Sequence, residues 1–191
     1  MPLPVNVKIH CSQVKRPDYK RYREHSEVEP GAIDIARLEA AMRESVGDRI
    51  SLANGFLKSA GRLMVGAPDE IDARNSVSRA YYCVHHVGRA LLMFEERGDR
   101  EGHAEVSNAF VTLVKNIGFL RSKLGDSGSF RTNLQGLIDH RHLADYYPSG
   151  ASDPRETPLN FMDAAIDAIN QARLIVDAVE EYIVNKEAGA I

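Results

Sequence analysis

The chain has 191 residues and a formal net charge of −3, from 24 Lys and Arg against 27 Asp and Glu. Its 43% hydrophobic and 27% charged residues are typical of a globular protein and exclude a disordered chain. The net charge excludes a polycation that coats nucleic acid, and two cysteines exclude a disulfide framework. No apolar run is long enough to span a membrane and the N-terminus lacks a signal peptide's apolar stretch, so we expect a soluble cytoplasmic protein.

Residues 1–31 form a basic segment with little hydrophobic periodicity. Between Lys8 and Arg23, six bases stand against the single acid Asp18, a local charge of +5, which leaves −8 for the rest of a chain of net −3. The bases are Lys8, Lys15, Arg16, Lys20, Arg21 and Arg23. We expect an extended arm that attracts phosphate, with Tyr19 and Tyr22 available for base stacking. The alternatives are a solvated tail and a strap that pairs with the acidic remainder.

Residues 32–187 are expected to form one helical domain. Apolar residues recur every three or four positions from Ile35 to Met64, which predicts a long amphipathic helix that Gly47 bends or interrupts. The sequence Gly66-Ala67-Pro68 ends this helix, and the Asp69 carboxylate is expected to cap the next one.

Two more helices are predicted after Asp69. The second ends near Arg97, before Gly98-Asp99, and the third runs from about His103 to Val114. The core stripe of the second helix consists of Ala80, Val84, Val87, Leu91 and Phe94.

The C-terminal third of the chain predicts two further helices. The fourth follows a loop at Gly125–Gly128 and closes at Pro148. Pro154 and Pro158 both suit a first helical turn, so the fifth begins at one of them. Because no segment shows the pattern of a β-hairpin, we expect an all-α fold, an up-and-down bundle of four to five helices.

Four polar residues on the second helix share one side, opposite the core stripe. Arg79, Tyr82, His86 and Arg89 are spaced 3, 4 and 3 residues apart, which places them together on a helix. Two guanidinium groups beside an imidazole and a phenol are suited to binding phosphate. The alternative is a polar seam between helices or a dimer contact.

A second polar group closes the fourth helix. Arg141 and Asp145 are one turn apart, as are His142 and Tyr146. Together they supply a phosphate donor, a general acid or base and orienting groups. The alternative is a helix end at which His and Arg suit the dipole and the tyrosines pack on a neighbouring helix.

The histidines do not have metal-ligand spacing, and no cofactor is expected. His85 and His86 point about 100° apart on a helix, and no His-x3-His pair or carboxylate cluster completes a zinc set. Cys83 falls on the core side of its helix and is expected to be inert.

Three stretches resemble the HEPN family (higher eukaryotes and prokaryotes nucleotide-binding). The run at residues 78–92 reads SRAYYCVHHVGRALL and is similar to a signature on the family's second core helix. His103, followed by a hydrophobic helix, resembles the next family stretch, and residues 141–146, RHLADY, resemble its "R..ADY" segment. The resemblance covers about residues 35–186 and implies a homodimer. It also adds His103 to the candidate phosphate- or nucleotide-binding residues Arg79, Tyr82, His86 and Arg89.

Many members of this family cut RNA without metal through an Arg-x4–6-His motif, as toxins or defence effectors. A minimal nucleotidyltransferase is a frequent antitoxin partner. Mapped here, Arg141 takes the arginine position and His142 the polar position that follows it, but Asp145 or Tyr146 stands where the catalytic histidine would fall. Ribonuclease activity would then need His142, His86 or His103 as a substitute.

Two main hypotheses follow from the resemblance. The first is a non-catalytic module that binds RNA, a nucleotide or a nucleotidyltransferase partner through the Arg/His faces. The second is an active metal-independent ribonuclease toxin in which Arg141 holds the scissile phosphate. A structural dimerisation scaffold is a third possibility.

Overall fold

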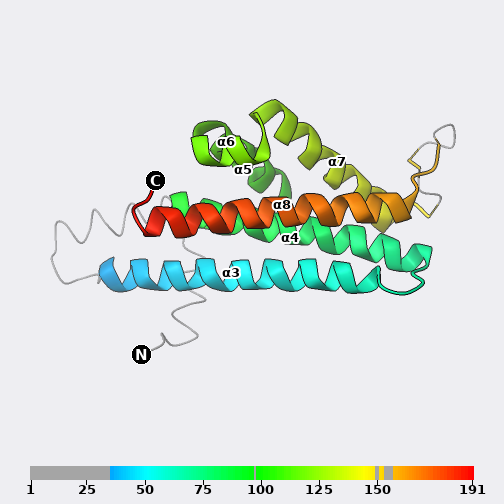
Figure 1. Cartoon of the computed structure of the whole chain (residues 1–191), viewed down its shortest axis with the longest axis horizontal. Coiled ribbons are helices and arrows are strands. Elements are labelled where there is room, and N and C mark those ends of the chain that lie inside the picture. The colour runs from blue at the N-terminus through cyan, green and yellow to red at the C-terminus, as the bar shows by residue number, and fades with distance from the viewer. Residues whose placement is uncertain (1–34, 97, 149–150, 153–156) are drawn as a thin grey trace.

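The computed structural model describes residues 35–96, 98–148, 151–152 and 157–191. These residues form helices and contain no strand (Figure 1). The helices are α3 (Ile35–Leu63), α4 (Glu70–Glu96), α5 (His103–Asn116), α6 (Gly118–Leu124), α7 (Ser127–Tyr146) and α8 (Phe161–Glu187). The all-α prediction is therefore confirmed. The basic arm at residues 1–31 lies outside the described residues. None of the described helices is both long and apolar enough to cross a membrane.

The long helices α3, α4 and α8 lie side by side, and α4 is central because it contacts α3, α5, α7 and α8. Helix α3 runs opposite to α4 and α8, while α7 crosses α4 obliquely (Figure 1). The predicted core stripe of α4 is buried, but burial is not confined to it. Every residue from Ala90 to Phe94 is buried, since this part of α4 is covered on several sides.

The helix boundaries confirm some predictions and correct others. Helix α3 continues through Gly47 without a break. Asp69 does cap α4: its carboxylate accepts from the Asp72 N–H at 2.8 Å, and the Asp72 carboxylate accepts from the Asp69 N–H at 3.3 Å. Helix α8 begins at Phe161, after both prolines, because the Asn160 side chain caps its first turn.

Helix α6 was not predicted. It has 7 residues, about two turns, which is too short for an apolar period to emerge from the sequence. Its Leu120 and Leu124 are buried. Helix α6 packs on α8 as well as on α5, so it closes the core beside the long helices.

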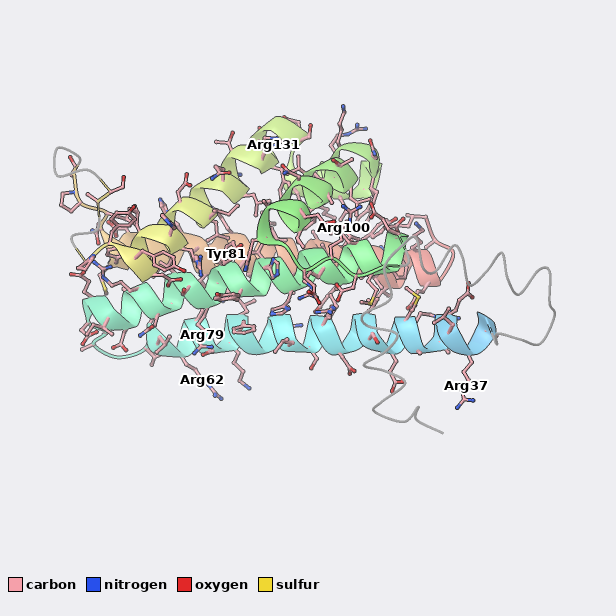
Figure 2. The ribbon with its side chains drawn as sticks, turned by 180° about the vertical axis from the view of Figure 1, so that it is seen from behind. Arg37, Arg62, Arg79, Tyr81, Arg100 and Arg131 are labelled. Atoms are coloured by element: carbon pink, nitrogen blue, oxygen red, sulfur yellow. The ribbon has the colours of Figure 1, made fainter. Side chains whose placement is uncertain are left out.

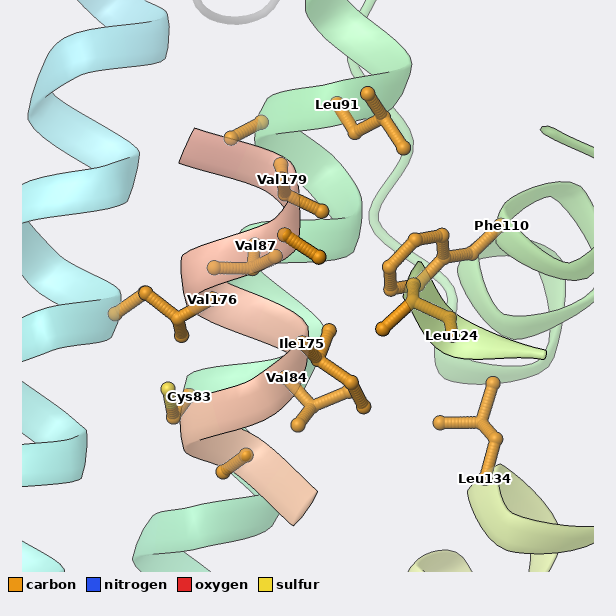
Figure 3. Packing of buried hydrophobic residues seen from close by; sticks show 14 of the residues in the cluster. Cys83, Val84, Val87, Leu91, Phe110, Leu124, Leu134, Ile175, Val176 and Val179 are labelled. Carbon is orange, nitrogen blue, oxygen red and sulfur yellow. The ribbon is translucent and has the colours of Figure 1, made fainter. Parts of the chain in front are cut away.

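The main core lies between α3, α4, α8 and the α5–α7 segment. Phe110 of α5 and Leu124 of α6 point toward Val84 of α4 and Ile175 of α8 (Figure 3). Gly88 permits this approach: a β-carbon added there would lie 2.9 Å from Cδ1 of Phe110. The close contact seats α5, and with it the His103 ring, against α4.

Candidate functional site

Arg141 projects from α7 onto the tyrosines of α4. Its Nη2 donates a hydrogen bond to the Tyr82 hydroxyl at 3.1 Å. Its guanidinium carbon lies 5.6 Å from the ring centroids of both Tyr81 and Tyr82 and 5.4 Å from that of Tyr146, all within cation–π range. The packing of α7 on α4 thus joins the two polar groups that the sequence places on separate helices.

Asp145 holds Arg141 from the next turn of α7. The Arg141 Nε lies 2.7 Å from Oδ2 of Asp145, and Oδ1 accepts a hydrogen bond from the Ser78 hydroxyl at 2.6 Å. Burial lowers the pKa of Arg141, but the Asp145 carboxylate and the Tyr82 hydroxyl outweigh it, so the pKa is raised. The carboxylate therefore fixes a charged Arg141 and ties the end of α7 to α4.

An open cleft of about 400 Å³ lies between α3 and α4 beside this ion pair. Six residues line it: Phe56, Asn75, Ser78, Arg79, Tyr82 and His86. The Arg79 guanidinium carbon lies 5.6 Å from the Phe56 ring centroid, so the side chain reaches from α4 over α3 (Figure 2). Arg79 is exposed and has no hydrogen bond or ion pair with any other described residue.

The floor of the cleft is aromatic. The His86 ring stacks on Phe56 with 5.4 Å between centroids and 8° between planes, and the Tyr82 ring also stacks with Phe56, at 5.7 Å between centroids and 29° between planes. Burial and then the nearby Arg49 lower the pKa of His86 to about 4. Its Nδ1 is buried without a hydrogen-bond partner among the described side chains. The cleft therefore combines an arginine that has no ion pair within the described part of the chain with the flat rings of Phe56, Tyr82 and a neutral His86.

His103, the first residue of α5, contacts α4 behind Arg141. Its Nδ1 lies 2.6 Å from the Tyr81 hydroxyl, and its ring centroid lies 4.3 Å from that of His85. Burial, followed by Arg141 and Arg89, lowers the pKa of His103. Burial and then His103 lower the pKa of His85 to about 3. These imidazoles are thus neutral near pH 7, as a general base must be.

Arg89 does not join the cleft residues, although it shares their helix face. Its Nε donates to Asp99 Oδ1 at 3.0 Å and its Nη2 to Oδ2 at 2.6 Å, and Arg49 binds the same carboxylate. Asp99 is 6% exposed. The Arg89 fork is therefore filled by a carboxylate from the α4–α5 loop, whereas Arg79, Tyr82 and His86 of the same helix face line the cleft.

His142 lies on the outer side of α7. Its exposed ring contacts those of Tyr146 and Tyr147, with centroids 5.1 Å and 5.4 Å away. His142 and Arg141 are adjacent in sequence, but the helix directs them to different sides. No group of three His, Cys, Asp or Glu side chains within the described ranges is arranged to hold a metal ion.

Sequence reasoning did not single out Phe56, Ser78, Tyr81 or Asp99 as parts of the site. Ser78 and Tyr81 adjoin the chosen residues on α4 and could have been found by asking which neighbours share their face. Phe56 is next to Leu57, one of the recurring apolar residues of the helix predicted from Ile35 to Met64, and its position marks the helix side that meets α4. Nothing in the sequence indicates that Asp99, in a short loop, is buried between two arginines.

No family model, curated protein or solved structure matches the chain. The arrangement of these side chains therefore carries the functional argument.

Proposed function

We propose that the chain is a HEPN-type helical module of the toxin–antitoxin or defence kind that binds the phosphate of RNA or a nucleotide without cleaving it. One observation carries the proposal: Arg79 is exposed over an aromatic cleft and has no acid to neutralise it among the described residues. A guanidinium in this setting offers a two-pronged donor to a phosphate.

The rest of the cleft supports a nucleotide as the ligand. Proteins hold single-stranded nucleic acid with cations along the backbone and with aromatic rings on which the bases stack. One stacked base contributes about 1–3 kcal/mol. Phe56 and the neutral His86 ring line the cleft within reach of Arg79 and supply aromatic surface on which a base can stack.

The second polar group favours binding over cleavage. Asp145 occupies a position at which the family resemblance implies a catalytic histidine, and it forms an ion pair with Arg141. A carboxylate beside this arginine opposes the approach of a phosphate, whereas a histidine would assist it. Arg141, His142, Asp145 and Tyr146 are therefore proposed as a degenerate ribonuclease site.

The same resemblance supplies the proposed partners. The opposite directions of α3 and α4, and of α7 and α8, fit an up-and-down bundle (Figure 1). The resemblance implies that such a bundle forms a homodimer. Tyr146 is 60% exposed beside Arg141 and offers a surface to a minimal nucleotidyltransferase antitoxin.

Binding of a fluorescent single-stranded RNA and of labelled ATP to the full chain tests this function. Arg79→Ala should weaken binding and flatten its salt dependence by about 0.7 in the log–log slope, the share of one phosphate contact. Arg173→Ala removes an equal charge from an exposed position on α8 and should leave binding unchanged. Equal affinities of both variants and the parent would refute the assignment to the cleft.

A metal-independent ribonuclease is the second candidate, favoured by the contact between His103 and Tyr81 next to Arg141. A neutral His103 could accept a proton while Arg141 holds the phosphate. Incubation of RNA with the protein in EDTA separates the two functions. The binding module leaves the RNA intact, whereas an active site would degrade it and lose activity in Arg141→Ala.

A further inference from the structure

An apolar groove of about 280 Å³ lies at the end of the molecule opposite the loop between α3 and α4. It runs between the first half of α3 and the last turns of α8, with Phe94 of α4 behind it. Its apolar lining is Val46, Ile50, Phe94, Ile183 and Val184. Val184 is 63% exposed, a high value for a valine beside other apolar side chains. The volume is at the low end for small-molecule pockets and suits a few aliphatic side chains.

The groove lies close to the residue at which the described chain begins. Helix α3 begins at Ile35, and Arg43 and Val46, two and three turns later, already line the groove. From Ile9 to Ile35 the chain can span about 85–94 Å at about 3.3–3.6 Å per residue. The first 15 residues of α3 cover only about 22 Å at about 1.5 Å per residue, so the arm can reach any part of the groove.

The arm contains one segment with the right chemistry. Val5, Val7 and Ile9 alternate with Asn6, Lys8 and His10, so an extended backbone would place the three aliphatic side chains on one face. Basic residues follow this segment, and they are opposite in charge to Glu180 and Glu187 at the rim of the groove. Arg43 is the basic residue of the lining. The arm at residues 1–31 carries six bases and four acids, a charge of +2, against −5 for the remainder of the chain, which favours the same contact over long range.

We propose that Val5–Ile9 docks in the α3–α8 groove of the same chain and straps the N-terminal arm across these two helices. Val7 and Ile9 fill the apolar lining, Val184 is covered, and the bases from Lys15 onward lie along the acidic rim. The strap is independent of the phosphate-binding cleft, which opens between α3 and α4.

A disulfide trap in the full chain tests the strap. Cys11 is two residues from Ile9, so the Val184→Cys variant places a second thiol within reach of a docked arm. Copper-catalysed oxidation should then give an intramolecular disulfide, detected by mass spectrometry and by faster migration on a non-reducing gel. Cys83 does not interfere, because it is buried and burial raises its pKa to about 12.

Ile71→Cys is the matched control, since Ile71 is 67% exposed near the opposite end of the molecule, in the first turn of α4. The yield of the intramolecular disulfide should be at least tenfold lower in Ile71→Cys than in Val184→Cys. Equal yields for both variants, or no disulfide in Val184→Cys, would overturn the proposal. A disulfide between two chains would assign the groove to the arm of a second copy and would equally refute a strap within one chain.

A second set of variants tests which arm face docks. In the Val184→Cys background, Val7→Asp with Ile9→Asp should abolish trapping and lower the Tm of the full chain by about 2–4 °C. Asn6→Asp with His10→Asp makes a similar charge change on the other face and should preserve both. If the arm serves RNA instead, the Val7 and Ile9 changes would weaken RNA binding while trapping and Tm stay at parental values, and the strap would be excluded.

Discussion

Arg141 and Asp145 form an ion pair one turn apart on α7, with 2.7 Å between Nε and Oδ2. Asp145 also accepts a hydrogen bond from Ser78 of α4, so the pair is part of the contact between the two helices. The carboxylate is therefore expected to restrain both the position of Arg141 and its attraction for phosphate.

Replacing Asp145 tests this restraint. Asp145→Asn keeps the shape of the side chain but removes its charge, so Arg141 should become available to phosphate. Affinity for single-stranded RNA should rise, and the log–log salt dependence should steepen by about 0.7 for one added contact. Fluorescence anisotropy at several salt concentrations measures both quantities. Asp139→Asn, an equal change at an exposed position on α7, should leave them at parental values.

Asp99 is expected to be a strong determinant of stability. Its carboxylate is buried between Arg49 and Arg89, whose side chains are 15% and 14% exposed. Asp99→Asn leaves two largely buried guanidinium groups uncompensated and should lower the free energy of unfolding by about 3–5 kcal/mol. Urea unfolding measures the change. The exposed Asp167→Asn should cost less than about 0.5 kcal/mol, and a similar small cost at Asp99 would contradict the shared ion pair.

Stability should depend on pH through the buried histidines. The pKa values of His85 and His86 are lowered to about 3 and about 4, chiefly by burial, so both rings stay neutral in the folded protein at pH 5–6. The unfolded chain binds protons there because an ordinary histidine has a pKa of about 6.5. The stabilising effect of the neutral rings is thus complete above about pH 6.5 and falls as the pH drops toward 4.

A variant isolates the contribution of His85. His85→Gln should flatten the dependence of the free energy of unfolding on pH by about 1 kcal/mol per pH unit between about pH 5 and 6. Urea unfolding across this range gives the slope. An unchanged slope would show that His85 gains its proton equally in the folded and unfolded states.

Two glycine substitutions should act in opposite directions. Gly88→Ala places a methyl group 2.9 Å from Phe110 and 3.2 Å from Val106, and overpacking should cost about 1–3 kcal/mol. Gly61→Ala meets nothing within 4 Å and should gain about 0.5–1 kcal/mol from helix propensity. Thermal unfolding compares them. A gain in stability from Gly88→Ala would contradict overpacking against Phe110.

The apolar periods determined most of the helical structure. Stripes such as Ala80–Phe94 repeat at the helical spacing, which places helices α3, α4, α5, α7 and α8 and identifies their buried sides. Local signals placed some ends, as at Asp69, whose carboxylate caps the turn that follows it. They did not place the start of α8, because Asn160 competes with two prolines that suit a helix start equally well. Helix α6 depends on its contacts with α5 and α8, which a seven-residue segment does not encode.

The sequence also determined which residue types stand near one another along each helix, including Arg79 with Tyr82 and His86, and Arg141 with Asp145. Only the tertiary structure decided which of these groups meet. The packing of α7 on α4 brings Arg141 to Tyr82, and the packing of α3 on α4 brings Phe56 to Arg79. Arg89 instead forms an ion pair with Asp99. The physical reason is that a helix period fixes the face of a residue, whereas the partner of that face depends on contacts between segments tens of residues apart.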